Sequence, residues 1–181
     1  MVVPKSKEKK ADLLLVLFYI AYCAAVVFRV HVEATGYTSP DSDYYLEAAR
    51  SFTEGEKFYI KHLYGPDPSE VIYFSAWPVG YPILIAAASI FSGLNLFWAS
   101  KLVNLAFAGF GFLLLRHINR AYAFVLASIY SAFTFIEMYS YTWSEAVFLF
   151  GCLSFVVIFY RISVTGNIWL VYLLLTAAVF L

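Results

Sequence analysis

The sequence predicts an all-α integral membrane protein, a multi-span helical bundle with amphipathic juxtamembrane helices in its first outer loop. Apolar and aromatic residue types fill 62% of the 181 positions and only 13% are charged, a balance that soluble domains rarely show. Aromatic residues alone reach 20%, which is typical of proteins with aromatic belts at both membrane surfaces. The net charge is zero, so nothing indicates a nucleic-acid partner.

The first apolar run, Ala11 to Val32, predicts a transmembrane helix. It exceeds the apolar core of a secretory signal peptide and lacks a small-residue cleavage site, so we expect a retained anchor. The lysines before it are Lys5, Lys7, Lys9 and Lys10. Because a basic cluster beside a first span faces the cytoplasm, residues 1–10 are predicted to form a cytoplasmic tail and residues 33–96 an extracytoplasmic loop.

Inside that loop, a helix is predicted at about residues 40–54. Ser39 suits an N-cap, Pro40 suits the first helical position and Gly55 suits the stop. An apolar stripe at helical spacing follows the cap and comprises Tyr44, Tyr45, Ala48, Ala49 and Phe52. A stripe of this kind predicts an amphipathic helix that lies on the bilayer surface.

A second helix of the loop is predicted at residues 83–91. This apolar run of nine residues covers roughly half of a ~30 Å hydrocarbon core at about 1.5 Å per residue. We therefore expect a juxtamembrane or re-entrant helix. The preceding segment, Trp77 to Pro82, contains two prolines and a glycine and predicts a bent approach to it.

Further spans are predicted at residues 97–115, 121–136 and 146–160. A basic turn that holds Arg116 and Arg120 separates the first two of these and is expected in the cytoplasm. The last apolar run, 168–181, has 14 residues, which is short for a span, so we expect it to begin a fifth span that continues beyond Leu181.

Asp41 and Asp43 are the first candidates for chemistry. Each is a candidate general base or ligand of a divalent cation such as Mg²⁺ or Mn²⁺, although acids in a first helical turn also complement the helix dipole. At about 100° per residue, the two side chains point roughly 160° apart on a helix. We therefore expect only one of them to face a site.

Four other polar residues stand near the predicted outer ends of spans. Lys101 and Asn104 either meet an anionic lipid headgroup, or Lys101 simply extends its amine to the interface. Glu137 and Glu145 bound a short outer turn and are either a second acidic element of a site or ordinary solvated acids. The two cysteines fall inside apolar runs, and the three histidines lack metal-ligand spacing.

The order of these elements resembles the GT-C glycosyltransferases, and most closely the protein O-mannosyltransferases and lipid A aminoarabinose transferases. The positions that carry the resemblance are Asp41, Tyr44, Ala48, Tyr73, Phe74, Pro78, Tyr81 and Lys101. They cover an outer-loop acid, an aromatic-proline motif and a base near the start of the second span. The likeness extends over roughly residues 10–160, and it departs from the mannosyltransferases where Val79 replaces a second proline and Ser42 separates the two acids.

The resemblance implies a hexosyltransferase that moves a sugar from a polyprenyl-phosphate carrier to an extracytoplasmic protein, lipid or glycan, with inversion at the sugar carbon. Asp41 matches the family's site acid, and Asp43 is the runner-up. The candidate substrate-binding residues are Tyr44, Trp77, Tyr81, Lys101, Glu137 and Glu145. A divalent cation is the one cofactor left open, with Asp41 as its candidate ligand.

Two other classes fit the same composition. A non-catalytic subunit that scaffolds a larger membrane assembly needs only the spans. A transporter of lipid-linked substrates should show paired half-helices, intramembrane charge and an internal repeat, and the sequence has no repeat. The glycosyltransferase fold needs more spans than these, so we expect the 181-residue chain by itself to be inactive.

Overall fold

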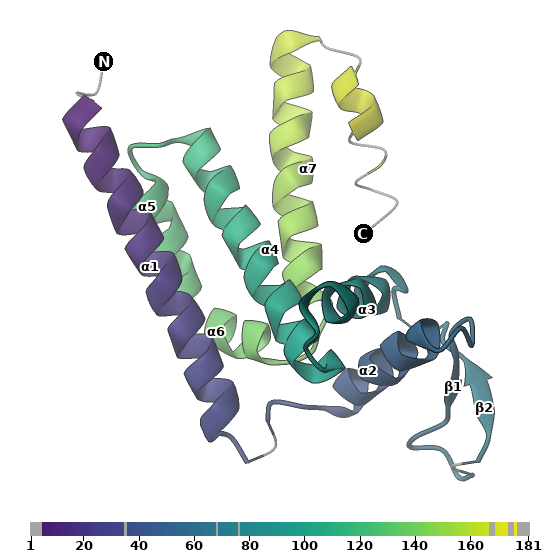
Figure 1. Cartoon of the computed structure of the whole chain (residues 1–181). Coiled ribbons are helices and arrows are strands. Elements are labelled where there is room, and N and C mark those ends of the chain that lie inside the picture. Colours follow the sequence, from purple (N-terminus) through teal and green to yellow (C-terminus); the bar gives the residue numbers. More distant parts are fainter. Residues whose placement is uncertain are drawn as a thin grey trace.

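The computed structural model describes residues 5–34, 36–67, 69–75, 77–166, 169–173 and 176, and over these residues the chain is mostly helical (Figure 1). The helices are α1 (Lys5–Val32), α2 (Pro40–Thr53), α3 (Gly80–Ser92), α4 (Leu96–Ile118), α5 (Ala123–Ala127), the 3₁₀ helix η1 (Ser128–Ser131), α6 (Phe133–Ser140) and α7 (Glu145–Thr165). Two short strands, β1 (Tyr59–Lys61) and β2 (Val71–Tyr73), form a hairpin. Most of the expected fifth span, 168–181, lies outside the described residues.

Among the described residues, three helices are long and apolar enough to cross a membrane. They are Glu8–Val32 within α1, Leu96–Ile118 and Glu145–Thr165. In Figure 1 the axes of these helices are roughly aligned, with α1 running opposite to α4 and α7, while α2, α3 and the hairpin gather at the end away from the N-terminus. Their length and composition indicate a membrane protein.

The expected third span, 121–136, is wrong as a single straight helix. The chain instead forms α5 and η1, breaks at Ala132 and continues as α6 at an angle of 70°. Ala132 has an extended backbone with φ −62° and ψ 138°. The hydroxyls of Ser128 and Ser131 each donate to the carbonyl three residues earlier, at 2.6 Å. These side-chain bonds favour a tight turn over a continuing α-helix.

Helix α2 begins at the predicted cap, and four of the five residues of its apolar stripe are buried inside the protein. The Ser39 hydroxyl accepts from the Ser42 backbone N–H at 3.3 Å, and Pro40 occupies the first turn. The stripe residues Tyr44, Tyr45, Ala48 and Ala49 are buried in a cluster with residues of α3 and α4. The expectation that this stripe contacts lipid meets a different environment, because the apolar α3 lies alongside α2 and covers most of the stripe.

The β-hairpin was not expected. Tyr59 pairs with Tyr73, and Ile60 pairs with Ile72, in antiparallel register. Ile60 is 2% exposed because this face of the hairpin packs on α2, while both tyrosines face outward. Aromatic and β-branched residues favour strands, but runs of only three residues give no periodicity to recognise in advance.

The α3–α4 corner sets the geometry of the site. Gly93 ends α3 with a left-handed φ of 71°, a conformation that glycine adopts without steric penalty. Asn95 then caps α4, since its side-chain oxygen accepts from the Trp98 backbone N–H at 2.9 Å. The corner folds α3 back onto α4. It thereby brings the first residues of α3 to the start of α7.

Candidate functional site

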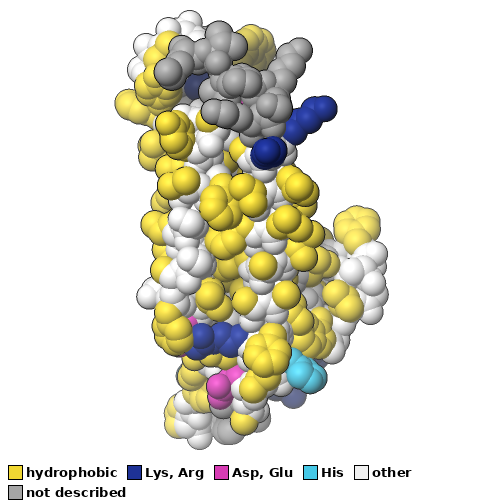
Figure 2. Space-filling model, turned by 90° about the vertical axis from the view of Figure 1, so that its left-hand side faces the viewer, with side chains coloured by type: hydrophobic (Ala, Val, Ile, Leu, Met, Phe, Trp, Pro, Cys, Tyr) yellow, Lys and Arg dark blue, Asp and Glu magenta, His cyan; other side chains and the backbone are white. Residues whose placement is uncertain are grey.

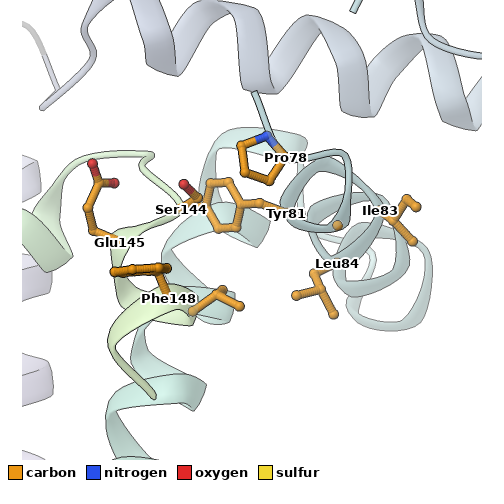
Figure 3. A pocket seen from close by; sticks show the side chains of 9 residues that line it. Pro78, Tyr81, Ile83, Leu84, Ser144, Glu145 and Phe148 are labelled. Atoms are coloured by element: carbon orange, nitrogen blue, oxygen red, sulfur yellow. The ribbon is translucent and has the colours of Figure 1, made fainter. Parts of the chain in front are cut away.

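A cleft of about 370 Å³ lies between the start of α3 and the start of α7 (Figure 3). Its walls are mostly apolar, with Tyr81 and Leu84 contributed by α3 and Phe148 by α7. Ser144 and Glu145 supply its polar atoms. In Figure 3 the Tyr81 ring extends toward Ser144, and Glu145 stands beyond it at the start of α7. The cleft therefore combines an apolar body with a carboxylate on its lining.

Tyr45 connects α2 to this cleft. Its hydroxyl donates to the Ser144 hydroxyl at 2.9 Å. Burial raises the pKa of Tyr45, the bond with Ser144 opposes that shift, and the negative charges of Glu145 and Asp41 raise the pKa further. Both carboxylates therefore act on the same phenol. Asp41 is an exposed residue of α2 and is not among the residues that line the cleft.

Asp43 lies in different surroundings from Asp41. Its carboxylate accepts a hydrogen bond from the Tyr64 hydroxyl, which raises the pKa of that tyrosine. Asp43 and Tyr64 line a separate shallow hollow on the outer side of α2. The two aspartates thus have separate partners, as their helical spacing leads one to expect.

Tyr44 and Trp77 stack on each other with their ring centroids 5.1 Å apart. Trp77 also stacks on Phe74, at 5.7 Å. Tyr44 is buried, and neither Tyr44 nor Trp77 lines the cleft. The aromatic group instead holds α2 against the segment that leads into α3, so these two candidate binding residues support the site from behind.

Tyr81 has two roles in the geometry. Its ring lines the cleft, while its hydroxyl, in a side chain only 2% exposed, donates to the Asn104 side-chain oxygen at 2.8 Å. The Asn104 amide donates in turn to the carbonyls of Tyr139 and Tyr141, at 3.2 and 2.7 Å. Burial raises the pKa of Tyr81 well above its usual value. These bonds tie α3, α4 and the α6–α7 loop together.

Lys101 is buried behind the cleft, not extended to a surface. Its side chain is 2% exposed, its amine donates to the Thr142 hydroxyl at 2.9 Å and lies 4.6 Å from the centre of the Phe97 ring. Thr142 also bonds Ser100, at 2.8 Å. Among the residues that the structure describes, no carboxylate forms an ion pair with Lys101. An ammonium held in this way is costly in free energy.

The two glutamates of the expected outer turn separate. Glu137 lies within α6, half-buried, and does not line the cleft. Glu145 begins α7 and does line it. Across the described ranges, no group of three His, Cys, Asp or Glu side chains lies close enough together to hold a metal ion.

The sequence reasoning missed three hydroxyl residues of the site, namely Tyr45, Thr142 and Ser144. One signal was available. Ser100, Lys101 and Asn104 place polar groups on one face of a helix that is otherwise apolar, and such a face needs polar partners. The α6–α7 loop supplies them, but the spacing within α4 does not say which loop it will be.

The chain was compared with protein-family models, with curated proteins and with solved structures, and nothing matches in any of the three. The functional argument therefore rests on the residues and geometry of the cleft, together with the motif resemblance in the sequence.

Proposed function

We propose that this chain belongs to a GT-C-type membrane glycosyltransferase, which transfers a sugar from a polyprenyl-phosphate carrier to an extracytoplasmic acceptor. The observation that carries the proposal is the apolar cleft between α3 and α7 with Glu145 on its lining. A lipid-linked sugar needs both an apolar surface for its isoprenoid and polar groups for its phosphate and sugar.

The proposal includes a membrane placement. Helices α1, α4 and α7 cross the bilayer, and the bent pair of α5 and α6 forms a broken span or re-entrant segment. The N-terminus and the basic residues Arg116 and Arg120 face the cytoplasm. The end that carries α2, α3 and the hairpin then faces outward, so the cleft opens at the extracytoplasmic surface. The whole is a multi-span bundle of the GT-C kind.

The proposed reaction is a single displacement at the sugar carbon. Asp41 takes the proton of the acceptor nucleophile, a bond forms from that nucleophile to the sugar carbon, and the bond from carbon to the phosphate oxygen breaks. The electron pair leaves with the lipid phosphate. Glu145 orients the sugar by accepting hydrogen bonds from its hydroxyl groups. In this scheme no oxidant or reductant is consumed.

Lys101 is proposed to stabilise the departing phosphate, which gains negative charge as the bond breaks. The support is a buried ammonium without a carboxylate partner, one helical turn from Asn104. The amine is held by Thr142, so this role requires the α6–α7 loop to move away from α4 when substrate binds. Lys101→Met keeps the side-chain length and removes the charge, and we expect a lower turnover number with the fold retained.

The test uses the product of the complete gene in native membranes, with a polyprenyl-phosphate sugar as donor. Asp41→Asn is expected to lower turnover by about 10²–10⁴-fold, the range for loss of a general base. Asp67→Asn is the matched control, because Asp67 lies on the hairpin loop and its carboxylate bonds only Ser69 among its described neighbours. Wild-type turnover by Asp41→Asn would show that this residue is not the base.

Asp43→Asn decides between the two aspartates. If Asp41 is the base, Asp43→Asn should keep most of the turnover, since the Asp43 carboxylate faces Tyr64 on the other side of α2. A loss in Asp43→Asn without a loss in Asp41→Asn would move the role to Asp43. Full activity in both variants would show that neither Asp41 nor Asp43 takes part in the mechanism.

One observation favours a second function, that of a non-catalytic subunit. The span of α7 has no buried residue in its most apolar stretch, and large side chains such as Phe155 and Phe159 are exposed along it. A partner's helix would cover this face. A stoichiometric partner that is lost on Phe155→Ser, together with no donor binding by the complete gene product, would favour the subunit over the enzyme.

A further inference from the structure

We propose that a second site, at the outer end of α1, binds the headgroup of a zwitterionic aminophospholipid such as phosphatidylethanolamine. A cavity of about 410 Å³ lies there, lined by apolar side chains of α1 and α6 and by Arg29, Glu33 and Tyr37. It shares no residue with the cleft between α3 and α7. The site is independent of the proposed glycosyl transfer and depends only on the membrane placement.

Arg29 is positioned so that one edge of its guanidinium remains free. Its Cζ lies 4.3 Å from the centre of the Phe133 ring and 5.0 Å from that of Tyr37, and its Nε–H donates to the Tyr37 hydroxyl. The two Nη groups make no hydrogen bond to any other described residue. A guanidinium held by ring contacts and by its Nε offers the remaining N–H groups to a phosphate, which it can bind with two parallel hydrogen bonds.

Glu33 supplies the opposite charge in the same cavity. Its backbone N–H donates to the Arg29 carbonyl at 3.1 Å, so the two residues lie one helical turn apart on one face. They form no ion pair with each other or with other residues in the described part of the chain. A free cation and a free carboxylate on one cavity match a phosphate and an ammonium that are joined in one headgroup.

The charges select among lipid headgroups. An anionic headgroup such as phosphatidylglycerol would satisfy Arg29 but bring no cation to Glu33. Phosphatidylcholine carries a cation without N–H donors, so it cannot hydrogen-bond a carboxylate. An ethanolamine ammonium has N–H donors that can reach Glu33 while its phosphate meets Arg29.

The depth of the cavity fits a lipid. The apolar stretch Glu8–Val32 has 25 residues, or about 37 Å at 1.5 Å per residue, somewhat more than the ~30 Å core of a bilayer. Arg29 and Glu33 at its end therefore lie at headgroup level. Ala25, one turn deeper than Arg29, and Phe28, the residue before Arg29, would meet the first carbons of the acyl chains. Figure 2 shows this side, where a long hydrophobic surface gives way to charged side chains at its lower end.

The experiment measures lipid binding by the delipidated complete chain with native mass spectrometry. Phosphatidylethanolamine, phosphatidylglycerol and phosphatidylcholine are compared with identical acyl chains. We expect the first to bind most tightly, and Arg29→Gln to weaken it by about tenfold, the loss of one charge-assisted hydrogen-bond pair. His31→Gln is the control, because His31 is exposed on α1 and does not line the cavity.

Glu33→Gln separates the two halves of the site. Glu33 is exposed, so this variant should fold even if Arg29→Gln does not. It is expected to abolish the preference for phosphatidylethanolamine over phosphatidylglycerol while leaving phosphate binding by Arg29. Equal binding of all three lipids by the wild type, or an unchanged preference in Glu33→Gln, would overturn the proposal and leave only bulk lipid contact.

Discussion

The two ends of the helical bundle are held together by different chemistry. At the end where α2, α3 and the α6–α7 loop meet, which we call the loop end, the buried network joins neutral groups such as Tyr81 and Asn104, while ion pairs such as Glu47–Arg50 lie nearer its surface. At the opposite, N-terminal end, Asp12 of α1 accepts from Arg116 at 2.7 Å and also from Arg120. The side chains of these ions are 25–41% exposed.

This contrast follows from the free energy of removing charge from water. A buried ion pair must offset a large desolvation penalty, whereas a buried amide or hydroxyl needs only its hydrogen-bond partners. Partly exposed ions keep some of their hydration, but solvent and salt then weaken their attraction. The loop end should therefore be the stronger and less salt-sensitive of the two, and Lys101 is its single charged exception among the buried residues described.

The largest effect is expected for Asn104→Leu at the loop end. Leucine has a similar volume, so little cavity forms, but the Tyr81 hydroxyl and the carbonyls of Tyr139 and Tyr141 lose their partner. The free energy of unfolding should fall by about 3 kcal/mol, because unpaired buried polar groups keep their full desolvation penalty. Reversible unfolding in mixed detergent micelles measures this change.

Asn119→Leu is the control for that substitution. The Asn119 side chain is exposed and only accepts from the Tyr122 backbone N–H at 3.4 Å, so its loss should cost less than about 0.5 kcal/mol. Adding Tyr81→Phe to Asn104→Leu should cost less than the two changes made separately, since they share one bond. If Asn104→Leu unfolded with the same denaturant midpoint as the wild type, this network would not stabilise the loop end.

A smaller effect is expected for Asp12→Asn at the N-terminal end. It removes the carboxylate shared by Arg116 and Arg120, and the free energy of unfolding should fall by about 1 kcal/mol. The loss should shrink when salt is raised from about 0.05 M to about 0.5 M, because exposed ions are screened. Glu8→Gln, which removes one bond to Arg120 at 2.7 Å, should cost less. A salt-independent loss would contradict the comparison.

The smallest effect is a pH dependence of the ion pair on α2. Glu47 accepts two hydrogen bonds from Arg50, at 2.6 and 2.9 Å, and these lower the pKa of Glu47 below its ordinary value of 4.5. A carboxyl whose folded pKa is lowered stabilises the fold above pH 4.5 and loses that contribution as the pH falls through the folded pKa. Arg50 is 39% exposed, so we expect about 0.5 kcal/mol.

Glu47→Gln tests this pair. The difference in unfolding free energy between wild type and variant should be present at pH 6 and shrink as the pH falls below 4.5. Glu56→Gln, an exposed carboxylate outside the pair, should show no such difference. A gap between wild type and Glu47→Gln that persists in acid would mean that the pair does not act through the ionised carboxylate.

The local signals in the sequence located most helices. Ser39 and Pro40 placed the start of a helix where α2 begins, and the charge-free run of residues 83–91 placed a short helix where the structure has α3. Such signals are readable because a cap or an apolar run acts on residues within one or two turns. The bend at Ala132 escaped them, since its serines look like ordinary small residues in an apolar stretch.

What the sequence by itself determined is the mostly helical class, the apolar stretches long enough to cross a membrane and the polar face of α4. Only the tertiary structure decided which groups meet, such as Tyr45 with Ser144 and Lys101 with Thr142, and that Glu145 rather than Glu137 lines the cleft. The physical reason is distance along the chain. Hydropathy and capping are local, whereas these contacts join residues 41 to 99 positions apart and depend on how whole helices pack.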